Sequence, residues 1–367
     1  DDDIVWTRSI FFAGEDGAID RVDTEDLPAP FHNAAGFAGV RFLTWGDKIK
    51  IALAMRRIML MGPEARLAMA GTSFADWLTA TGQSQRAIDR FWAPVIESAC
   101  NEKVDRTDAR YGLQVFAEGF LPHPRAGEMG LPSVPLVALY DAAEPAIEAA
   151  GGRLRLRTSV AEIGFADGVV TGITTRDGGE VVGDAYVSAL PPDRLAKVIG
   201  PAMVESDDRL ARLEEFDHSP IIGIHLFYDR PVTELPHVAQ VTGKLQWLFN
   251  RGWDAEVGGH HLHGVISAAH ELVDQPAEAI LEQVLADAAV ALPAAADAEL
   301  VHHRVVKEKR ATFSVLPGID ALRPPAAGTI ENLALAGDWC DTGWPATMEG
   351  ATRSGYLAAD AVIEHLG

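Results

Sequence analysis

The strongest constraint on the fold lies near the C-terminus, where a buried strand, a short loop and a helix are predicted in direct succession. The four apolar residues 333–336 indicate a strand that ends at Gly337 and Asp338. Gly343 and Pro345 then mark a loop. Beyond it, small and apolar residues recur at intervals of three and four, the spacing of one helix face: Ala351, Ser354, Gly355, Ala358, Ala359 and Val362.

This arrangement suits an electron-rich ligand at the start of the helix. The first helical turn leaves backbone N–H groups without partners and carries the positive end of the helix dipole. A flavin gains negative charge around N1 and its C2 carbonyl on reduction, so a helix start at 348–351 would stabilise the reduced form. Asp338, at the strand end, would accept hydrogen bonds from sugar hydroxyls.

The segment AGDWCDTGWPATMEGATRSGYLAA, residues 336–359, resembles the C-terminal FAD motif of the phytoene-desaturase and amine-oxidase superfamily. Its tryptophan-rich form is most similar to the squalene-associated desaturase branch, the hydroxysqualene dehydroxylases. The resemblance extends, in the order of the family, to residues 94–116, 130–140 and 307–318. It therefore covers nearly the whole chain.

The resemblance implies FAD as the cofactor and assigns it residues along the chain. At the C-terminal motif these are Gly337, Asp338, Thr347, Met348, Glu349, Gly350 and Ala351. Upstream, Val160 matches a family valine whose backbone contacts the FAD adenine. From one sequence, Val160 is equally well explained as an ordinary strand residue.

The implied fold is α/β with mixed α+β character, in which a Rossmann-like FAD domain interleaves with a substrate domain of sheet and helices. We expect the FAD domain at 134–200 and 326–367, and the substrate domain at 1–133 and 201–325. The family opens with a GxGxxG turn that holds the FAD pyrophosphate, and this sequence contains no such turn and does not begin with Met. We therefore expect an FAD domain incomplete at its N-terminus, either because the chain is a fragment or because its start was lost in gene calling.

In the resembled dehydroxylases, reduced FAD converts hydroxysqualene to squalene. Loss of the allylic hydroxyl leaves a delocalised cation that a hydride quenches, so the reaction needs an acid and a pocket that excludes water. We expect Trp344 to form an aromatic wall by cation–π attraction. Asp341 is our candidate for the acid, although its position also suits a residue that caps the loop turn.

Other functions fit the same motifs. A carotenoid desaturase of the phytoene type moves electrons in the opposite direction and differs mainly in pocket shape. An amine oxidase would need an aromatic cage and a lysine near the flavin, neither of which can be assigned. Without the pyrophosphate turn, a lipid-binding, non-catalytic fragment is also consistent with the sequence.

The amino-acid composition limits the kinds of partner that we expect the protein to bind. The formal net charge of −22 opposes nucleic-acid binding and broad adsorption to anionic membranes. No apolar run is long enough to span a membrane, and no signal-peptide pattern is present. Cys100 and Cys340 form neither a disulfide framework nor a metal-ligand spacing. We expect a cytoplasmic protein without a metal, whose substrate is a long apolar isoprenoid and whose contact with the inner face of the membrane is local.

Residues 36–61 depart from the acidic average. They contain five basic residues and one acid, a local charge of +4, interleaved with apolar residues. The pattern predicts an amphipathic helix, capped by Asp47, that runs to about Leu60. A core helix with solvated basic side chains explains the pattern, and so does a basic lip that rests on a membrane and admits a lipid.

Elsewhere the sequence predicts a hairpin over 4–22, helices from Ser84, over 106–118, over 134–150 and over 276–291, and strands at 219–228, 261–268 and 300–306. Short strands between 154 and 190 predict a β-meander. Alternation places His261 and His263 on one strand face. With no acid at ligand spacing, the histidines are interpreted as strand residues rather than metal ligands.

Overall fold

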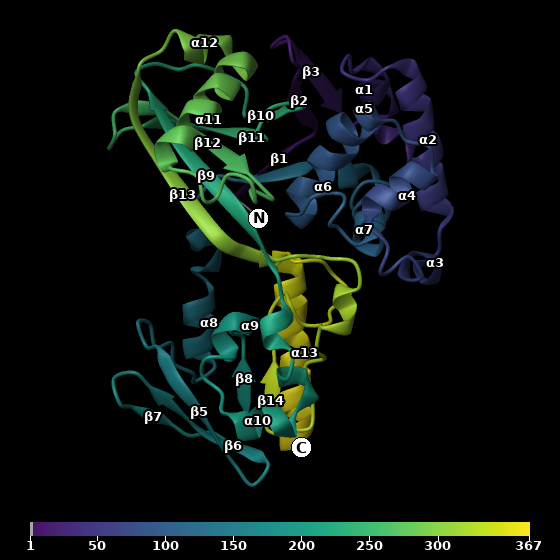
Figure 1. The fold of residues 1–367 in the computed structure, drawn as a ribbon. Coiled ribbons are helices and arrows are strands. Elements are labelled where there is room, and N and C mark those ends of the chain that lie inside the picture. The colour runs from purple at the N-terminus through teal and green to yellow at the C-terminus, as the bar shows by residue number, and fades with distance from the viewer. Residues whose placement is uncertain (1–2) are drawn as a thin grey trace. The chain divides into compact units, whose positions relative to one another are not determined.

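The structure is a computed structural model that describes residues 3–367 (Figure 1). The chain forms two compact units. The smaller unit joins residues 3–5 with Gly130–Asp217 and Ile319–Gly367. The larger unit combines Trp6–Met129 with His218–Gly318. Each unit is therefore assembled from segments that are far apart in the sequence.

A seven-stranded sheet forms the centre of the larger unit, in the order β13-β9-β12-β11-β10-β2-β3. Its strands are β2 (Ser9–Ala13), β3 (Ile19–Asp23), β9 (His218–Tyr228), β10 (His237–Gln240), β11 (Trp247–Asp254), β12 (Gly259–Ile266) and β13 (Leu300–Phe313). Neighbours are antiparallel except β10 and β2, which are parallel. The pairing of β2 with β3 confirms the predicted hairpin, and β13 is longer than predicted. Two further short strands are β1 (Ile4–Thr7) and β4 (Met129–Pro132).

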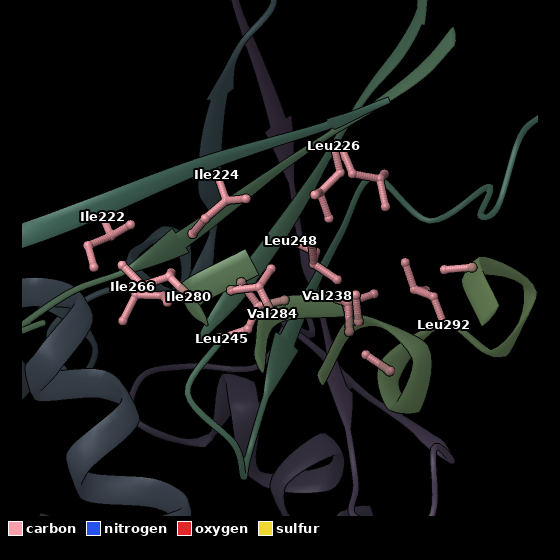
Figure 2. Packing of buried hydrophobic residues seen from close by; sticks show 14 of the residues in the cluster. Ile222, Ile224, Leu226, Val238, Leu245, Leu248, Ile266, Ile280, Val284 and Leu292 are labelled. Atoms are coloured by element: carbon pink, nitrogen blue, oxygen red, sulfur yellow. The ribbon is translucent and has the colours of Figure 1, made fainter. Parts of the chain in front are cut away.

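One face of this sheet packs against helix α11 (Ala277–Ala291) (Figure 2). Ile222, Ile224 and Leu226 alternate along β9 and cluster with Ile280 and Val284 of the helix. All five side chains are fully buried. The core forms because the period of two along the strand and the helical spacing of α11 present continuous apolar faces to each other.

The remaining helices of the larger unit are α1 (Ala34–Gly39), α2 (Trp45–Leu60), α3 (Pro63–Leu67), α4 (Phe74–Ala80), α5 (Gln85–Ala87), α6 (Ala93–Cys100), α7 (Ala109–Gly119) and α12 (Pro293–Ala296). Aromatic rings hold several of them together. The ring of Trp92 lies 4.7 Å from that of Phe116 and 5.9 Å from that of Phe74, measured between centroids. The indole N–H of Trp92 donates to Gln83 Oε1 at 3.0 Å, so this buried polar group is satisfied.

Helix boundaries differ from the prediction at three places. Thr44, not Asp47, caps α2: Thr44 Oγ1 accepts from the Asp47 N–H and the Asp47 carboxylate accepts from the Thr44 N–H, which is a capping box. A π-helical turn over Ile88–Trp92 interrupts the helix that follows Ser84, just ahead of Pro94. Asp108 caps α7, which therefore begins three residues later than predicted.

The smaller unit contains a three-stranded meander of β5 (Val160–Ala166), β6 (Val169–Thr175) and β7 (Glu180–Val181). A second sheet pairs β8 (Tyr186–Ser188) in parallel with β14 (Leu333–Leu335). Its helices are α8 (Ala143–Ala149), α9 (Pro192–Leu195), α10 (Pro201–Ser206) and α13 (Met348–Leu366).

Three predictions in this unit were wrong in detail. The strand at Tyr186 leaves the meander for β14, and residues 154–156 form no strand. The helix predicted over 134–150 is divided into a 3₁₀ segment, Leu136–Tyr140, and α8. The division follows from Pro145, whose ring clashes with the carbonyl four residues earlier and prevents a continuous helix.

Candidate functional site

The predicted strand, loop and helix at the C-terminus are present as β14, residues 336–347 and the 19-residue helix α13. Thr347 caps the helix: its Oγ1 accepts from the Gly350 N–H at 3.1 Å and its carbonyl accepts from the Ala351 N–H at 3.0 Å. The N–H groups of Met348 and Glu349 have no acceptor within the helix, as in any first turn. The start of α13 therefore presents amide donors and the positive end of a long helix.

The side chain of Ser354 connects the end of β14 to α13 by hydrogen bonds. The Gly337 N–H donates to Ser354 Oγ at 2.7 Å, and that hydroxyl donates to the Ala351 carbonyl at 2.6 Å. Gly337 has a φ of +131°, and a Cβ at this position would lie 2.5 Å from Nε1 of the buried Trp339. Only glycine therefore allows the strand to turn here without displacing the indole, whose N–H donates to the Leu190 carbonyl at 3.1 Å.

A buried arginine organises the loop that follows. Arg323, only 5% exposed, donates to the carbonyl of Asp338 at 2.9 Å and to that of Cys340, and it reaches Thr342 Oγ1 at 3.3 Å. These acceptors are mainly backbone groups, which no sequence pattern reveals, so sequence reasoning missed Arg323. Its guanidinium fixes the path of the loop between the strand end and the helix start.

The two candidate reactive residues lie on this loop but in different surroundings. Asp341 is exposed, and its backbone N–H donates to the Pro324 carbonyl at 2.8 Å. The guanidinium carbon of Arg353 lies 4.8 Å from the centroid of the half-buried Trp344 ring, and Arg353 is in turn paired with Glu349 at 2.7 Å. One face of the Trp344 indole is therefore already in contact with a cation from α13.

Val160 lies on a different sheet from the other predicted site residues. It begins β5, opposite Thr175 of the meander. Asn332 connects the meander to β14, because its Oδ1 accepts from the Val170 N–H and its Nδ2 donates to the Val170 carbonyl, both at 2.9 Å. The structure thus brings the residues at 337–351 together and places Val160 on the neighbouring sheet of the same unit.

These residues fit the flavin half of an FAD molecule. The free amides at the start of α13 match an electron-rich ring edge. Ser188 Oγ, at the carboxyl end of β8, is buried and has no hydrogen-bond partner among the described residues 3–367. The carboxyl edge of a parallel strand pair is where α/β proteins bind such ligands. The chain's own residues offer no GxGxxG turn for the pyrophosphate.

The cysteines do not add a nucleophile to the site. Cys340 lies in the loop and is buried, and desolvation raises the pKa of its thiol to about 12. Burial likewise raises the pKa of Cys100, in the larger unit, to about 12. Burial and the raised pKa therefore disfavour the reactive thiolate at both positions.

Three histidines gather on the face of the large sheet opposite α11. His225 Nδ1 lies 3.0 Å from His261 Nε2, and the rings of His225 and His263 stack with centroids 4.6 Å apart. Desolvation, with a contribution from His225, lowers the pKa of both His261 and His263 to about 4. Within residues 3–367, no group of three or more candidate ligands has a geometry that would hold a metal ion.

Within residues 3–367, pockets open at two places in the larger unit, among others. One, of about 340 Å³, is lined by α6 and the strand edges around Gln246 and Ser267. It contains Glu97, whose burial raises its pKa although Lys103 lies 2.9 Å away. The other, of about 250 Å³, lies around Arg41 and Arg90. Neither is lined by a predicted site residue.

Comparison with known proteins gives a consistent family signal. The family described as flavin containing amine oxidoreductase matches residues 2–363. The 15-cis-phytoene desaturase of Solanum lycopersicum is 28% identical over 384 residues, which cover 99% of this chain and 65% of the relative. A probable zeta-carotene desaturase of Synechococcus elongatus is 26% identical over 392 residues, 96% of this chain and 81% of the relative. The chain thus spans less than two thirds of the length of the tomato protein.

Solved structures show the same fold. An oxidoreductase from Methanosarcina mazei superimposes with a TM-score of 0.71 at 18% identity, over 98% of this chain and 82% of the other. Putrescine oxidase bound to putrescine gives a TM-score of 0.66 at 14% identity, over 98% and 83%. At these identities the likeness establishes the fold alone, and it confirms the predicted mixed α/β architecture over nearly the whole chain.

Proposed function

The chain belongs to the flavin containing amine oxidoreductase family, and from this premise we propose that it is an FAD-dependent oxidoreductase acting on a long apolar isoprenoid of the carotenoid type. FAD is the cofactor typical of this family. The observation that carries the proposal is the similarity to phytoene and zeta-carotene desaturases across 96–99% of the chain. Because a substrate this apolar partitions into bilayers, a peripheral membrane contact through residues 36–61 belongs to the same proposal.

In this proposal the smaller unit holds the cofactor and the larger unit shelters the substrate. Residues 347–351, with Gly337 and Asp338, would hold the isoalloxazine edge, and Val160 would contact the adenine. When bound, FAD supplies two-electron hydride chemistry. The chain contributes the positive end of α13, which favours the reduced and more negative state of the ring, and the Arg323 contacts that keep the loop in place.

The comparisons favour desaturation over the hydroxysqualene reaction that the tryptophan-rich motif suggests. Dehydroxylation remains the second candidate because of that motif, residues 336–359. The two reactions make different demands on the chain. Desaturation removes a hydride and a proton from the substrate and needs no acid for a leaving hydroxyl, whereas dehydroxylation does need one. Asp341 is the proposed acid and Trp344 the proposed wall in the second case only.

The test supplies the FAD-loaded protein with phytoene and a quinone acceptor, or with hydroxysqualene and a reductant, and analyses the lipids by chromatography. We expect phytoene to lose hydrogen and Asp341→Asn to leave that turnover unchanged. Conversion of hydroxysqualene alone, abolished by Asp341→Asn, would replace the first candidate with the second. Bound FAD with no conversion of either lipid would contradict both and support a non-catalytic lipid-binding role.

A further inference from the structure

Helix α2 carries apolar side chains on two opposite faces, of which only one packs within the larger unit. The packed face consists of Ile51, Ala54 and Ile58, which are 0–3% exposed. Their spacing of three and four is that of an ordinary core-facing helix stripe. This face alone accounts for the amphipathic pattern of the helix, so the second face needs its own explanation.

The second face is a row of solvent-exposed apolar residues along one side of the helix. Trp45, Ile49, Leu53 and Leu60 are 68%, 59%, 62% and 65% exposed. At about 3.6 residues per turn, they lie roughly opposite the buried stripe. Single exposed apolar residues are common, but four along one side of a helix, flanked by basic residues, mark an interaction surface. We call these four residues and the basic residues beside them the exposed face of α2.

The charge on this face is positive and uncompensated. Lys50, Arg56 and Arg57 are exposed, and within residues 3–367 none of them forms an ion pair. Lys48, in contrast, is buried: its Nζ donates to the Ala38 carbonyl at 2.6 Å and lies 4.6 Å from the Trp45 ring centroid. The helix has one acid, Asp47, which is buried. Its carboxylate takes part in the capping box with Thr44 and accepts a hydrogen bond from Ser84 Oγ at 2.5 Å.

The exposed apolar side chains and the cations beside them together indicate which partner binds this face. Self-association about a two-fold axis would bring the basic cluster of Lys50, Arg56 and Arg57 against the same cluster of a second copy, and this juxtaposition of like charges is unfavourable. A neutral apolar partner would leave the three cations desolvated and unpaired. An anionic phospholipid surface satisfies both features, since its headgroups neutralise the cations while the acyl boundary takes the apolar side chains. None of the helices within residues 3–367 has the length and apolar character needed to cross a bilayer.

We propose that the exposed face of α2 lies in the headgroup layer of a bilayer that contains anionic phospholipid, with Trp45, Ile49, Leu53 and Leu60 in the acyl boundary. The biological role of this attachment, access to a substrate dissolved in the bilayer, rests on the proposed function. The attachment itself does not, because it needs neither flavin nor turnover.

The test is co-sedimentation of the 367-residue chain with vesicles of phosphatidylcholine that either contain or lack phosphatidylglycerol. We expect binding to the anionic vesicles alone, weakened by salt. Each basic residue near such a surface contributes roughly a fivefold change in partitioning, so Lys50→Gln, Arg56→Gln and Arg57→Gln together should weaken binding about 100-fold. Ile49→Ser with Leu53→Ser should weaken it at least about tenfold through lost apolar burial.

Matched control variants remove the same kinds of side chain, basic or apolar, at exposed positions away from α2. The first neutralises three exposed arginines of the smaller unit: Arg153→Gln, Arg155→Gln and Arg157→Gln. The second replaces the exposed Val182 and Val301 by Ser. Both should leave binding unchanged, and circular dichroism verifies that every variant is folded.

Absence of vesicle binding, or an equal loss in the controls, would overturn the membrane assignment. A change from dimer to monomer in the α2 variants without any effect on vesicles would overturn it in favour of self-association. Turnover of detergent-dissolved phytoene is measured in parallel. Failure of that assay bears on the proposed function and leaves the vesicle result intact.

Discussion

The conformation of the loop between β14 and α13 depends on the buried cation of Arg323. Replacing Arg323 by Met tests this dependence. The substitution keeps an unbranched side chain in the space but removes the guanidinium. It leaves the carbonyls of Asp338 and Cys340 and the hydroxyl of Thr342 without this donor. Because the loop carries Asp341 and Trp344 and leads into α13, its disorder would reach the proposed flavin site directly.

The expected cost follows from these contacts. A buried carbonyl that loses its partner costs about 1–3 kcal/mol, so the Cys340 carbonyl alone lowers the free energy of unfolding by that amount, and the partly buried Asp338 carbonyl adds a smaller cost. Arg212 provides the matched control in the same unit: it pairs with Glu215 at 2.6 Å, but both side chains are about half exposed. Arg212→Met should change the free energy of unfolding far less, because exposed ion pairs contribute little to stability.

The assay is reversible urea unfolding followed by tryptophan fluorescence, with the free energy of unfolding extrapolated to water for each variant. We expect the urea midpoint for Arg323→Met to lie well below those of the wild type and Arg212→Met. Equal free energies of unfolding for the two arginine variants would contradict this expectation, since the guanidinium of Arg323 would then be no more than a solvated surface charge.

Three further predictions concern the cap, the core and pH. Thr347→Val removes the cap of α13 and should lower the free energy of unfolding by about 1 kcal/mol, whereas Thr352→Val, on the exposed side of the same helix, should change it little. Leu226→Ala in the fully buried core should cost about 2–5 kcal/mol, and the exposed control Val301→Ala less than about 0.5 kcal/mol; a small cost for Leu226→Ala would contradict the packing described. The pKa of His261 and His263 is lowered from 6.5 to about 4, so the unfolded chain takes up protons first as the pH falls. The contribution of these two histidines to stability should therefore be complete above pH 6.5 and be lost as the pH falls towards 4. His261→Gln with His263→Gln should flatten this dependence in urea titrations at several pH values, and an unchanged slope would contradict the assignment.

Local patterns predicted local structure well. The β14–loop–α13 unit was recognisable because apolar run, loop residues and helical spacing are all contained within one segment. The turn between β5 and β6 followed from Asp167-Gly168, both of which adopt positive φ.

Contacts between segments that are far apart in the sequence could not be predicted from it. Nothing near Tyr186 indicates that its strand pairs with Leu333 instead of the meander, because that choice is made by tertiary packing. Arg323 and Asn332 act on backbone groups brought close by the fold, so no spacing marks them. In α2, periodicity alone combined a buried and an exposed apolar face into one amphipathic helix, and only side-chain exposure separates them.

The proposed function requires that the start of α13 and the end of β14 hold the flavin of an FAD molecule. Hydrogen–deuterium exchange of the 367-residue chain with and without excess FAD tests it directly, while equilibrium dialysis measures binding. We expect slower exchange of the amides at 337–338 and 347–351 when FAD is present. Bound FAD that protects other segments and leaves these amides unchanged, or no binding at all, would contradict it.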